Sequence, residues 1–211
     1  MHHAFSSSAL ALAAFLAGQA SGGSITSTWI GPRAGNWGNA ANWDPSIVPL
    51  NGVSSFDVII DGPPRSPCTV TLDLSSITID GLTLGAGDVL VQPNNRSFTP
   101  HAVTNAGTWQ MNSTGNQTGF IVAVPEVTLN GDGVLLMSNS SQNRVYGTGG
   151  VRRLINGPGH TIRGAGQVGL NTDLVLTNAG LIDATQITAL VIDLVDAEES
   201  INTGVLQASG N

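Results

Sequence analysis

An Asn followed two or three residues later by a Gly recurs five times in the second half of the chain, usually ahead of a short apolar or β-branched run. The Gly positions are separated by 26, 26, 21 and 24 residues. Self-similarity at a period of about 20 to 50 residues is typical of stacked-repeat proteins. Because the repeated unit is strand-like, the pattern predicts a β-solenoid whose turns carry the pairs Asn105 and Gly107, Asn130 and Gly133, Asn156 and Gly159, Asn178 and Gly180, and Asn202 and Gly204.

The pairing of Asn with Gly has a structural explanation. Each solenoid turn must bend sharply, and a positive backbone φ costs least for Gly and next least for Asn. Adjacent turns lie about 4.8 Å apart. Asn side chains at one place on successive turns can therefore hydrogen-bond to each other as a ladder. The residues after each Gly enter a strand, and Trp109 is expected to fill the core or to form part of its wall.

Composition supports an all-β chain and excludes one class of partner. Hydrophobic residues make up 41% of the 211 residues, which is enough to bury a core. From residue 56 onward, short alternating runs such as 69–72 are separated by Gly, Pro and Asp turns. Charged residues are only 10%, and all seven basic residues are Arg. A chain this poor in positive charge lacks the basic surface that nucleic acid requires, so we expect no nucleic-acid partner.

The first twenty residues have the pattern of a secretory signal peptide. An apolar run covers residues 9–17, and the small-x-small sequence Gly18-Gln19-Ala20 follows it. The run is too short to span a bilayer, and no later segment reaches transmembrane length. We therefore expect residues 1–20 to be cleaved and the rest to be secreted or associated with the cell surface.

Residues 21–55 are expected to form a linker and an N-terminal cap. Trp29, Trp37 and Trp43 fall within this segment among many Gly, Pro and Asn residues, which indicates a folded loop region. A solenoid needs such a cap, because its first turn would otherwise expose an apolar cross-section and an unpaired strand edge. The alternative is that the three Trp side chains form an exposed platform that binds carbohydrate.

Residues 56–211 are expected to form the solenoid turns. The last predicted strand runs into 208–211 with no evident capping segment. We therefore expect the solenoid to continue beyond the C-terminus, or its last turn to stack end to end on another chain. Cys68 is the only cysteine, so no internal disulfide can form, and we expect a buried and inert thiol.

The chain resembles secreted bacterial β-helix repeat proteins such as autotransporter passengers and filamentous adhesins. The resemblance rests on Trp29-Ile-Gly31, Gly35-Asn-Trp37 and Ala41-Asn-Trp43-Asp44, and on segments 159–166 and 176–184. It implies a right-handed parallel β-helix on or outside the cell, and it supplies no catalytic residue. Partners implied by the resemblance are polysaccharide or cell-surface protein.

Four acidic residues and one Arg are candidates for catalysis, because β-helices also carry polysaccharide lyases and glycosidases. A glycosidase needs two carboxylates about 5 to 10 Å apart. Asp173 and Asp196 are 23 residues apart, close to one turn, and Asp183 and Asp193 are a second pair. Arg163 precedes Asp183 by 20 residues and could stack beside it as a lyase-type pair. Solvated turn carboxylates explain these spacings as well.

No other motif indicates chemistry. His160 is expected to line a turn, and it lies too far along the chain from His101 for a shared metal site. We expect neither a metal nor a cofactor. The sequence thus favours a non-catalytic, adhesin-like structural segment, with a carbohydrate-active β-helix enzyme or a glycan-binding module as alternatives.

Overall fold

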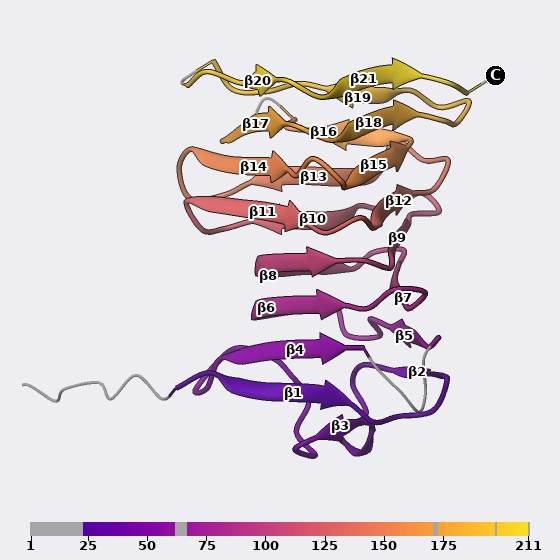
Figure 1. The fold of residues 1–211 in the computed structure, drawn as a ribbon, viewed down its shortest axis with the longest axis vertical. Coiled ribbons are helices and arrows are strands. Elements are labelled where there is room, and N and C mark those ends of the chain that lie inside the picture. The colour runs from indigo at the N-terminus through magenta and orange to yellow at the C-terminus, as the bar shows by residue number, and fades with distance from the viewer. Residues whose placement is uncertain (1–22, 62–66, 171–172, 197, 211) are drawn as a thin grey trace, which may run out of the picture.

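The computed structural model describes residues 23–61, 67–170, 173–196 and 198–210. In this part of the chain, strands wind into a stack of parallel turns that runs from β1 at one end to β21 at the other (Figure 1). The predicted all-β parallel solenoid is confirmed, and its right-handed winding stays a prediction. The expected signal peptide, residues 1–20, lies outside the described residues.

Two sheets form the sides of the stack. The eight-stranded sheet contains, in spatial order, β2 (Ala34–Asn36), β5 (Thr69–Thr71), β7 (Val89–Pro93), β9 (Thr108–Asn112), β12 (Val134–Met137), β15 (Thr161–Gly164), β18 (Leu181–Ala184) and β21 (Val205–Ala208). The 13-stranded sheet contains β1 (Ile25–Trp29), β3 (Trp43–Asp44), β4 (Phe56–Ile60), β6 (Ser76–Leu84), β8 (Ser97–Asn105), β10 (Thr118–Val122), β11 (Glu126–Asn130), β13 (Asn143–Gly147), β14 (Arg152–Asn156), β16 (Gly166–Val168), β17 (Leu174–Asn178), β19 (Leu190–Ile192) and β20 (Ile201–Asn202).

The larger sheet changes its construction half-way up the stack. Strand β8 pairs with two strands of the next turn, since Phe98 lies opposite Phe120 of β10 and Val103 lies opposite Leu129 of β11. The single long strand of the early turns therefore becomes two shorter strands in the later ones. The new corner lies between β10 and β11, whereas the recurring Asn residues end the strands that lead from the larger sheet into the eight-stranded sheet.

Alternation along the strands produces the core. In β4, Phe56, Val58 and Ile60 are buried and the two residues between them are partly exposed. Parallel pairing in register then places buried side chains of successive turns above one another. Trp109 is fully buried, as the core alternative predicted, and lies between Phe98 and Phe120 at ring-centre distances of 5.2 and 4.7 Å.

The N-terminal end is closed by a cap. Strand β3 runs antiparallel to β1, with Trp43 opposite Trp29, and so covers the outer edge of β1. A single-turn 3-10 helix, η1 (Ala40–Asn42), leads into it. The predicted Trp-rich cap therefore lies where a solenoid end would otherwise expose a strand edge.

Candidate functional site

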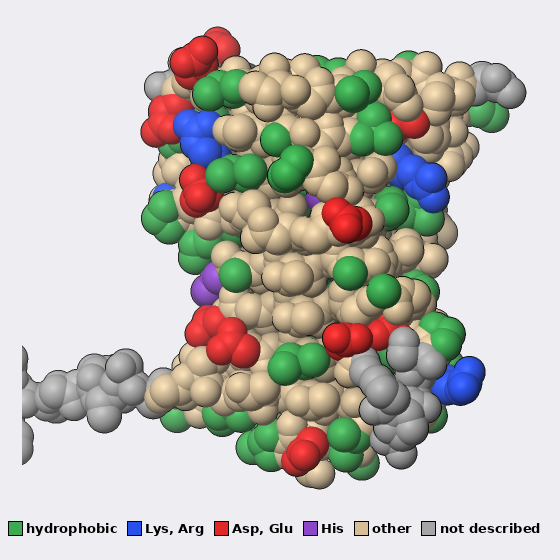
Figure 2. Space-filling view, viewed as in Figure 1, with side chains coloured by type: hydrophobic (Ala, Val, Ile, Leu, Met, Phe, Trp, Pro, Cys, Tyr) green, Lys and Arg blue, Asp and Glu red, His purple; other side chains and the backbone are tan. Residues whose placement is uncertain are grey.

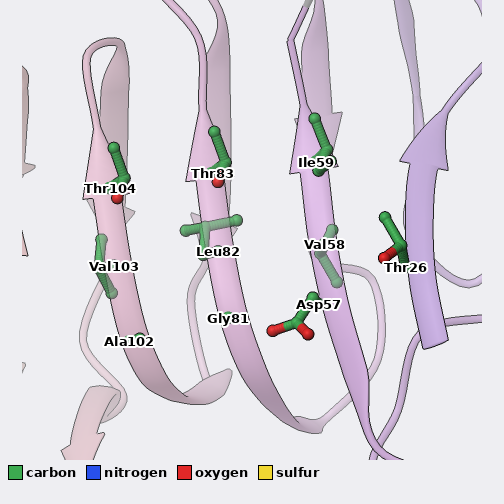
Figure 3. Close-up of a pocket in the computed structure, with 10 residues that line it drawn as sticks. All are labelled: Thr26, Asp57, Val58, Ile59, Gly81, Leu82, Thr83, Ala102, Val103 and Thr104. Carbon is green, nitrogen blue, oxygen red and sulfur yellow. The ribbon is translucent and has the colours of Figure 1, made fainter. Parts of the chain in front are cut away.

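A shallow hollow of about 270 Å³ lies on the outer face of the 13-stranded sheet, across β1, β4, β6 and β8 (Figure 3). Small residues form its floor, because Gly81 and Ala102 occupy consecutive turns beside Asp57. A Cβ on Gly81 would lie 2.5 Å from Oδ1 of Asp57, so a side chain at this position would have to displace the carboxylate. Asp57 is the one acidic residue among the lining residues, and a glycosidase pair of carboxylates is therefore not present in this hollow.

An Asp–His pair directly precedes two residues of this hollow, because Asp80 comes before Gly81 and His101 before Ala102. Nδ1 of His101 is 3.3 Å from Oδ1 of Asp80, and Asn51 Nδ2 donates to the same oxygen at 2.8 Å. Burial tends to raise the pKa of Asp80, but hydrogen bonds from Ser55 and Asn51 and the charge of His101 lower it overall. The Asp80 carboxylate thus ties the cap loop to the sheet, a role that the sequence did not reveal.

The predicted Arg163 and Asp183 do meet on adjacent turns. They lie opposite each other in the pairing of β15 with β18. However, the Asp183 carboxylate already accepts hydrogen bonds from Gln207 Nε2 at 2.9 Å and from the backbone and hydroxyl of Ser209 at 3.0 and 2.8 Å. The bond from Gln207 contributes most to lowering the pKa of Asp183, with smaller effects from Ser209 and Arg163. The carboxylate joins β18 to the next turn.

Asp173 also connects turns. Its Oδ2 accepts from the backbone N–H of Gly150 on the preceding turn at 3.1 Å. The predicted stacking of its segment with that of Asp196 is present, since Val195 N–H donates to Leu174 O at 3.0 Å. Asp196 itself is exposed in a turn. The two predicted partners therefore lie on segments that pair between neighbouring turns.

The acidic residues of the last loop form a separate group. Asp193 and Asp196 are exposed, and a hollow of about 480 Å³ is lined by Asp196, Glu198 and Glu199 with neighbouring apolar residues. Glu198 forms an ion pair with Arg153 at 3.0 Å. In the view of Figure 2, acidic side chains are scattered over the stack.

Asp183 lies on β18, while Asp193 follows β19, so the structure does not pair these two as predicted.

The three cap Trp residues are buried. Trp37 and Trp43 are fully buried and Trp29 is 6% exposed. Each indole N–H donates to a backbone oxygen. The Trp37 indole donates to Pro49 O at 2.9 Å, the Trp43 indole to Trp37 O at 2.7 Å, and the Trp29 indole to Pro32 O at 3.2 Å. Buried rings with satisfied N–H groups cannot stack on a sugar. The alternative of an exposed Trp platform is therefore wrong for the conformation described.

The predicted Asn ladder exists in part. Asn156, Asn178 and Asn202 lie in one column, with amide-to-amide hydrogen bonds of 2.8 and 2.7 Å between successive turns. Asn105 is also buried, and its Oδ1 accepts from Gly107 N–H at 3.0 Å. Asn130 is exposed and takes no part in the column, so its assignment to the ladder was wrong.

The structure explains why Asn130 points outward. Leu129 lies opposite Asn156 of the next turn and therefore occupies the ladder column on its own turn. Successive side chains of a strand point to opposite faces, so the residue after Leu129 must face solvent. Four of the five motif Gly residues, Gly107, Gly133, Gly180 and Gly204, approach the backbone of the preceding turn so closely that a Cβ would lie within 2.6 Å of a backbone atom.

The His160 ring links Asn105 to Asn156 and so extends the column across the turn that contains Leu129. Its Nδ1 lies 2.8 Å from Oδ1 of Asn156, and its Nε2 lies 3.1 Å from Nδ2 of Asn105. Nδ2 of Asn156 donates to Asn178, so Oδ1 of Asn156 is the acceptor and His160 must carry its proton on Nδ1. Donation therefore runs in one direction, from Asn105 through His160 to Asn202. The sequence placed His160 in a turn but did not predict this link.

Acid is expected to destabilise the chain through His160. Burial lowers the pKa of the His160 ring from 6.5 to about 4. Between these values the unfolded chain binds the proton and the folded chain does not, so the free energy of unfolding falls as pH decreases through this window. The expected difference is about 1.4 kcal/mol for each pH unit, with no contribution above about pH 6.5. Urea unfolding at a series of pH values measures it.

Two variants isolate this effect from the titration of carboxylates. His160→Gln should lose the His-dependent slope and be less stable at neutral pH. His101→Gln, which changes a half-exposed ring, should keep the slope. Identical pH dependence of stability in His160→Gln and the unaltered chain would contradict the assignment.

Cys68 has the inert environment that the sequence predicted. The side chain is 5% exposed, and the Cys68 backbone N–H donates to Oδ1 of Asp88 at 2.7 Å. Burial, with the charge of Asp88, raises the pKa of the Cys68 thiol to about 12. The thiol therefore stays protonated near neutral pH and is a poor nucleophile.

Within the described residues, no three His, Cys, Asp or Glu side chains come together as a metal site. The same residues contain no helix long and apolar enough to cross a membrane. No protein-family model, curated protein or solved structure matches the chain.

Proposed function

We propose that this chain is a non-catalytic structural segment of a secreted or cell-surface protein, in which the solenoid extends the molecule and presents its sheet faces and loops. One observation carries the proposal. The polar side chains that recur along the chain bond one turn to the next, as in the column from Asn105 to Asn202 and in the carboxylate of Asp183. In a β-helix enzyme, the candidate carboxylates Asp173, Asp183 and Asp196 would instead converge in a groove beside Arg163.

Resemblance to secreted bacterial β-helix repeat proteins agrees with this role. A stack with few charges and a repeated turn geometry gives a long rigid body from little sequence information. Polysaccharide or a cell-surface protein is the proposed partner of its faces. These partners follow from the resemblance and from the flat outer faces of a parallel solenoid.

A carbohydrate-active enzyme is the second candidate, and one observation favours it. Arg163 faces Asp183 across adjacent turns, the arrangement that a lyase-type pair needs. The three hydrogen bonds that Asp183 accepts from β21 and Ser209 speak against a catalytic role, because they hold the carboxylate in a structural contact. The structural role is therefore favoured.

An activity assay separates the two candidates. The chain and its Asp183→Asn variant are incubated with a panel of acidic and neutral polysaccharides, and new reducing ends and unsaturated products are measured. The proposal predicts no product with either protein and a lower melting temperature for Asp183→Asn. Product formed by the unaltered chain and lost in Asp183→Asn, with the variant still folded by circular dichroism, would show an enzyme.

Cell fractionation tests the proposed location. Bacterial cells producing the full chain should hold it in the medium or at the surface. Mass spectrometry should show a new N-terminus near Ala20, because the apolar run and small residues before it fit signal peptidase. Intact chain confined to the cytoplasm would contradict the proposal.

A further inference from the structure

Two rows of side chains cross the outer face of the larger sheet at the hollow beside Asp57 (Figure 3). Each row takes one residue from each of three successive turns, and the rows are Asp57, Gly81 and Ala102, and Ile59, Thr83 and Thr104. The residues between the rows, Val58, Leu82 and Val103, are at most 2% exposed and belong to the core. Because successive side chains of a strand point to opposite faces, both rows face solvent.

The hollow is the space left above the small residues of the first row. Its floor consists of Gly81 and of Ala102, whose side chain is a single methyl group. The Asp57 side chain points toward Gly81, where a Cβ would lie 2.5 Å from its Oδ1. Thr26 lies opposite Asp57 in the pairing of β1 with β4 and bounds the hollow on its other side. The carboxylate thus lies at the edge of a floor that has room for a ligand.

The lining combines one carboxylate with several hydroxyl groups. The hydroxyls belong to Thr26, Thr83 and Thr104. Each hydroxyl can donate one hydrogen bond and accept others. Asp57 is the one charged residue among the described residues that line the hollow, so its carboxylate disfavours an anionic ligand. Ile59 and Ala102 add apolar surface between these polar groups.

These groups suit a neutral sugar better than a metal ion. Calcium takes six to eight oxygen ligands, whereas the hollow offers one carboxylate, and the described residues contain no cluster of three metal-ligating side chains. A sugar ring carries hydroxyls around its edge and C–H groups on its faces, which match the hydroxyls and the apolar surface of the lining. The volume of about 270 Å³ lies just below that of sites for drug-sized ligands, as a single sugar unit requires.

The arrangement is repeated four residues further along the same turns. Gly85 N–H donates to Ile60 O at 2.8 Å, which places Gly85 beside Asp61, and Ala106 N–H continues the pairing by donating to Leu84 O at 2.8 Å. A Cβ on Gly85 would overlap Oδ1 of Asp61, so this carboxylate also leans over a glycine. Four residues of extended chain span roughly 13 Å. The face therefore presents two carboxylates of the same kind, one on each side of the row that contains the Thr residues.

We infer that this face binds a neutral polysaccharide, with one sugar unit in the Asp57 hollow and the sugar chain running along the strands toward Asp61. The inference rests on the proposed structural role and assigns a place and a chemical class to its polysaccharide partner. The Asp57 carboxylate accepts hydrogen bonds from two neighbouring sugar hydroxyls. Thr83 and Thr104 bond to hydroxyls at the ring edge, and a C–H face of the ring lies on Ala102.

Isothermal titration calorimetry of the full chain with defined oligosaccharides tests the inference. The probes are disaccharides and hexasaccharides of glucose, galactose, mannose and xylose, with oligogalacturonate as the acidic comparison. A neutral hexasaccharide should bind, and more tightly than its disaccharide, because it reaches both carboxylates. Oligogalacturonate should not bind, and EDTA should leave the affinity unchanged. Trp fluorescence should also stay unchanged, since no Trp lines the hollow.

Variants locate the binding site. Asp57→Asn should weaken binding about tenfold or more, because hydrogen bonds to a charged acceptor are the stronger ones, and Thr83→Val should weaken it about threefold. Asp61→Asn should weaken binding of the hexasaccharide and leave that of the disaccharide unchanged. The matched control is Thr161→Val, which removes a half-exposed hydroxyl from β15 of the other sheet and should not alter binding. Circular dichroism checks that each variant is folded.

Several results would overturn the inference. These are preference for the acidic oligosaccharide, loss of binding in EDTA, equal weakening in Thr161→Val, and unchanged affinity in folded Asp57→Asn and Thr83→Val. Absence of binding to every neutral probe would overturn it as well, while the structural role would stand. Failure of that role is seen separately, as product released from polysaccharide in the reducing-end assay.

Discussion

Replacing Asn156 with Ala is expected to lower the free energy of unfolding by about 3 kcal/mol or more. The side chain of Asn156 is fully buried, accepts from His160 Nδ1, and donates to Asn178 and to the backbone oxygen of Leu181. Its removal leaves several buried polar groups without partners, each at a cost of about 1 to 3 kcal/mol. Urea unfolding followed by circular dichroism measures the difference.

Asn130→Ala is the matched control for this prediction. Asn130 belongs to the same sequence motif but is exposed and lies outside the column. A surface substitution of this kind is expected to change the free energy of unfolding by less than about 0.5 kcal/mol. Equal losses in Asn130→Ala and Asn156→Ala would show that the motif acts through its turns and not through the buried column.

Trp43→Ala is expected to lower the free energy of unfolding by about 3 to 5 kcal/mol, because it leaves a large cavity in the cap. Trp43 is fully buried, and its ring lies 5.0 Å from Trp29 and 4.8 Å from Trp37 between ring centres. Trp43→Phe keeps most of the ring volume but loses the N–H bond to Trp37 O, so a loss of about 1 to 2 kcal/mol is expected.

Thermal unfolding of these variants is compared with that of Val53→Ala, which truncates a fully exposed cap side chain and should change stability little. Trp fluorescence gives a second readout. The buried rings should emit at short wavelength and should not respond to soluble glycans. A melting temperature of Trp43→Ala equal to that of the unaltered chain, or quenching by glycans, would contradict the cap.

The stacked fold could be predicted because its determinants repeat along the sequence. Each turn needs a Gly where the backbone of the preceding turn lies close, and the spacing of Gly107, Gly133 and Gly180 records that need. The alternation of apolar and polar residues within each strand shows which side chains point inward. The cap was predictable on separate grounds, because the end of a solenoid must be covered and the Trp cluster lies in the segment that reaches it.

Predicting which Asn residues belong to the ladder requires counting the residues between each Asn and the next strand. Asn105, Asn178 and Asn202 lie three residues before the next strand of the eight-stranded sheet, and Asn156 lies five before it. Asn130 lies four residues before β12. A shift of one residue turns a side chain to the opposite face, whereas a shift of two restores it. Counting back from the strand would have excluded Asn130, and the two additional residues after Asn156 provide the place that His160 occupies.

The fate of the candidate carboxylates depended on contacts between turns. Asp183 lies 24 and 26 residues before Gln207 and Ser209, about one turn, so the sequence was compatible with their hydrogen bonds but did not distinguish them from a pairing with Arg163. The Asp57 hollow and the Asp80–His101 pair depend on the register between β4, β6 and β8. That register is determined by loops of unequal length, which periodicity does not specify.

The column of side chains from Asn105 to Asn202 donates its hydrogen bonds in one direction, and ¹⁵N NMR of the histidine rings tests this most directly. Spectra of the chain and of His160→Gln, recorded from neutral to acidic pH, assign the His160 signals by difference. We expect a neutral ring with its proton on Nδ1, an unprotonated Nε2 that accepts from Asn105, and no protonation until the pH approaches about 4. A proton on Nε2 at neutral pH, or titration near 6.5, would contradict the column.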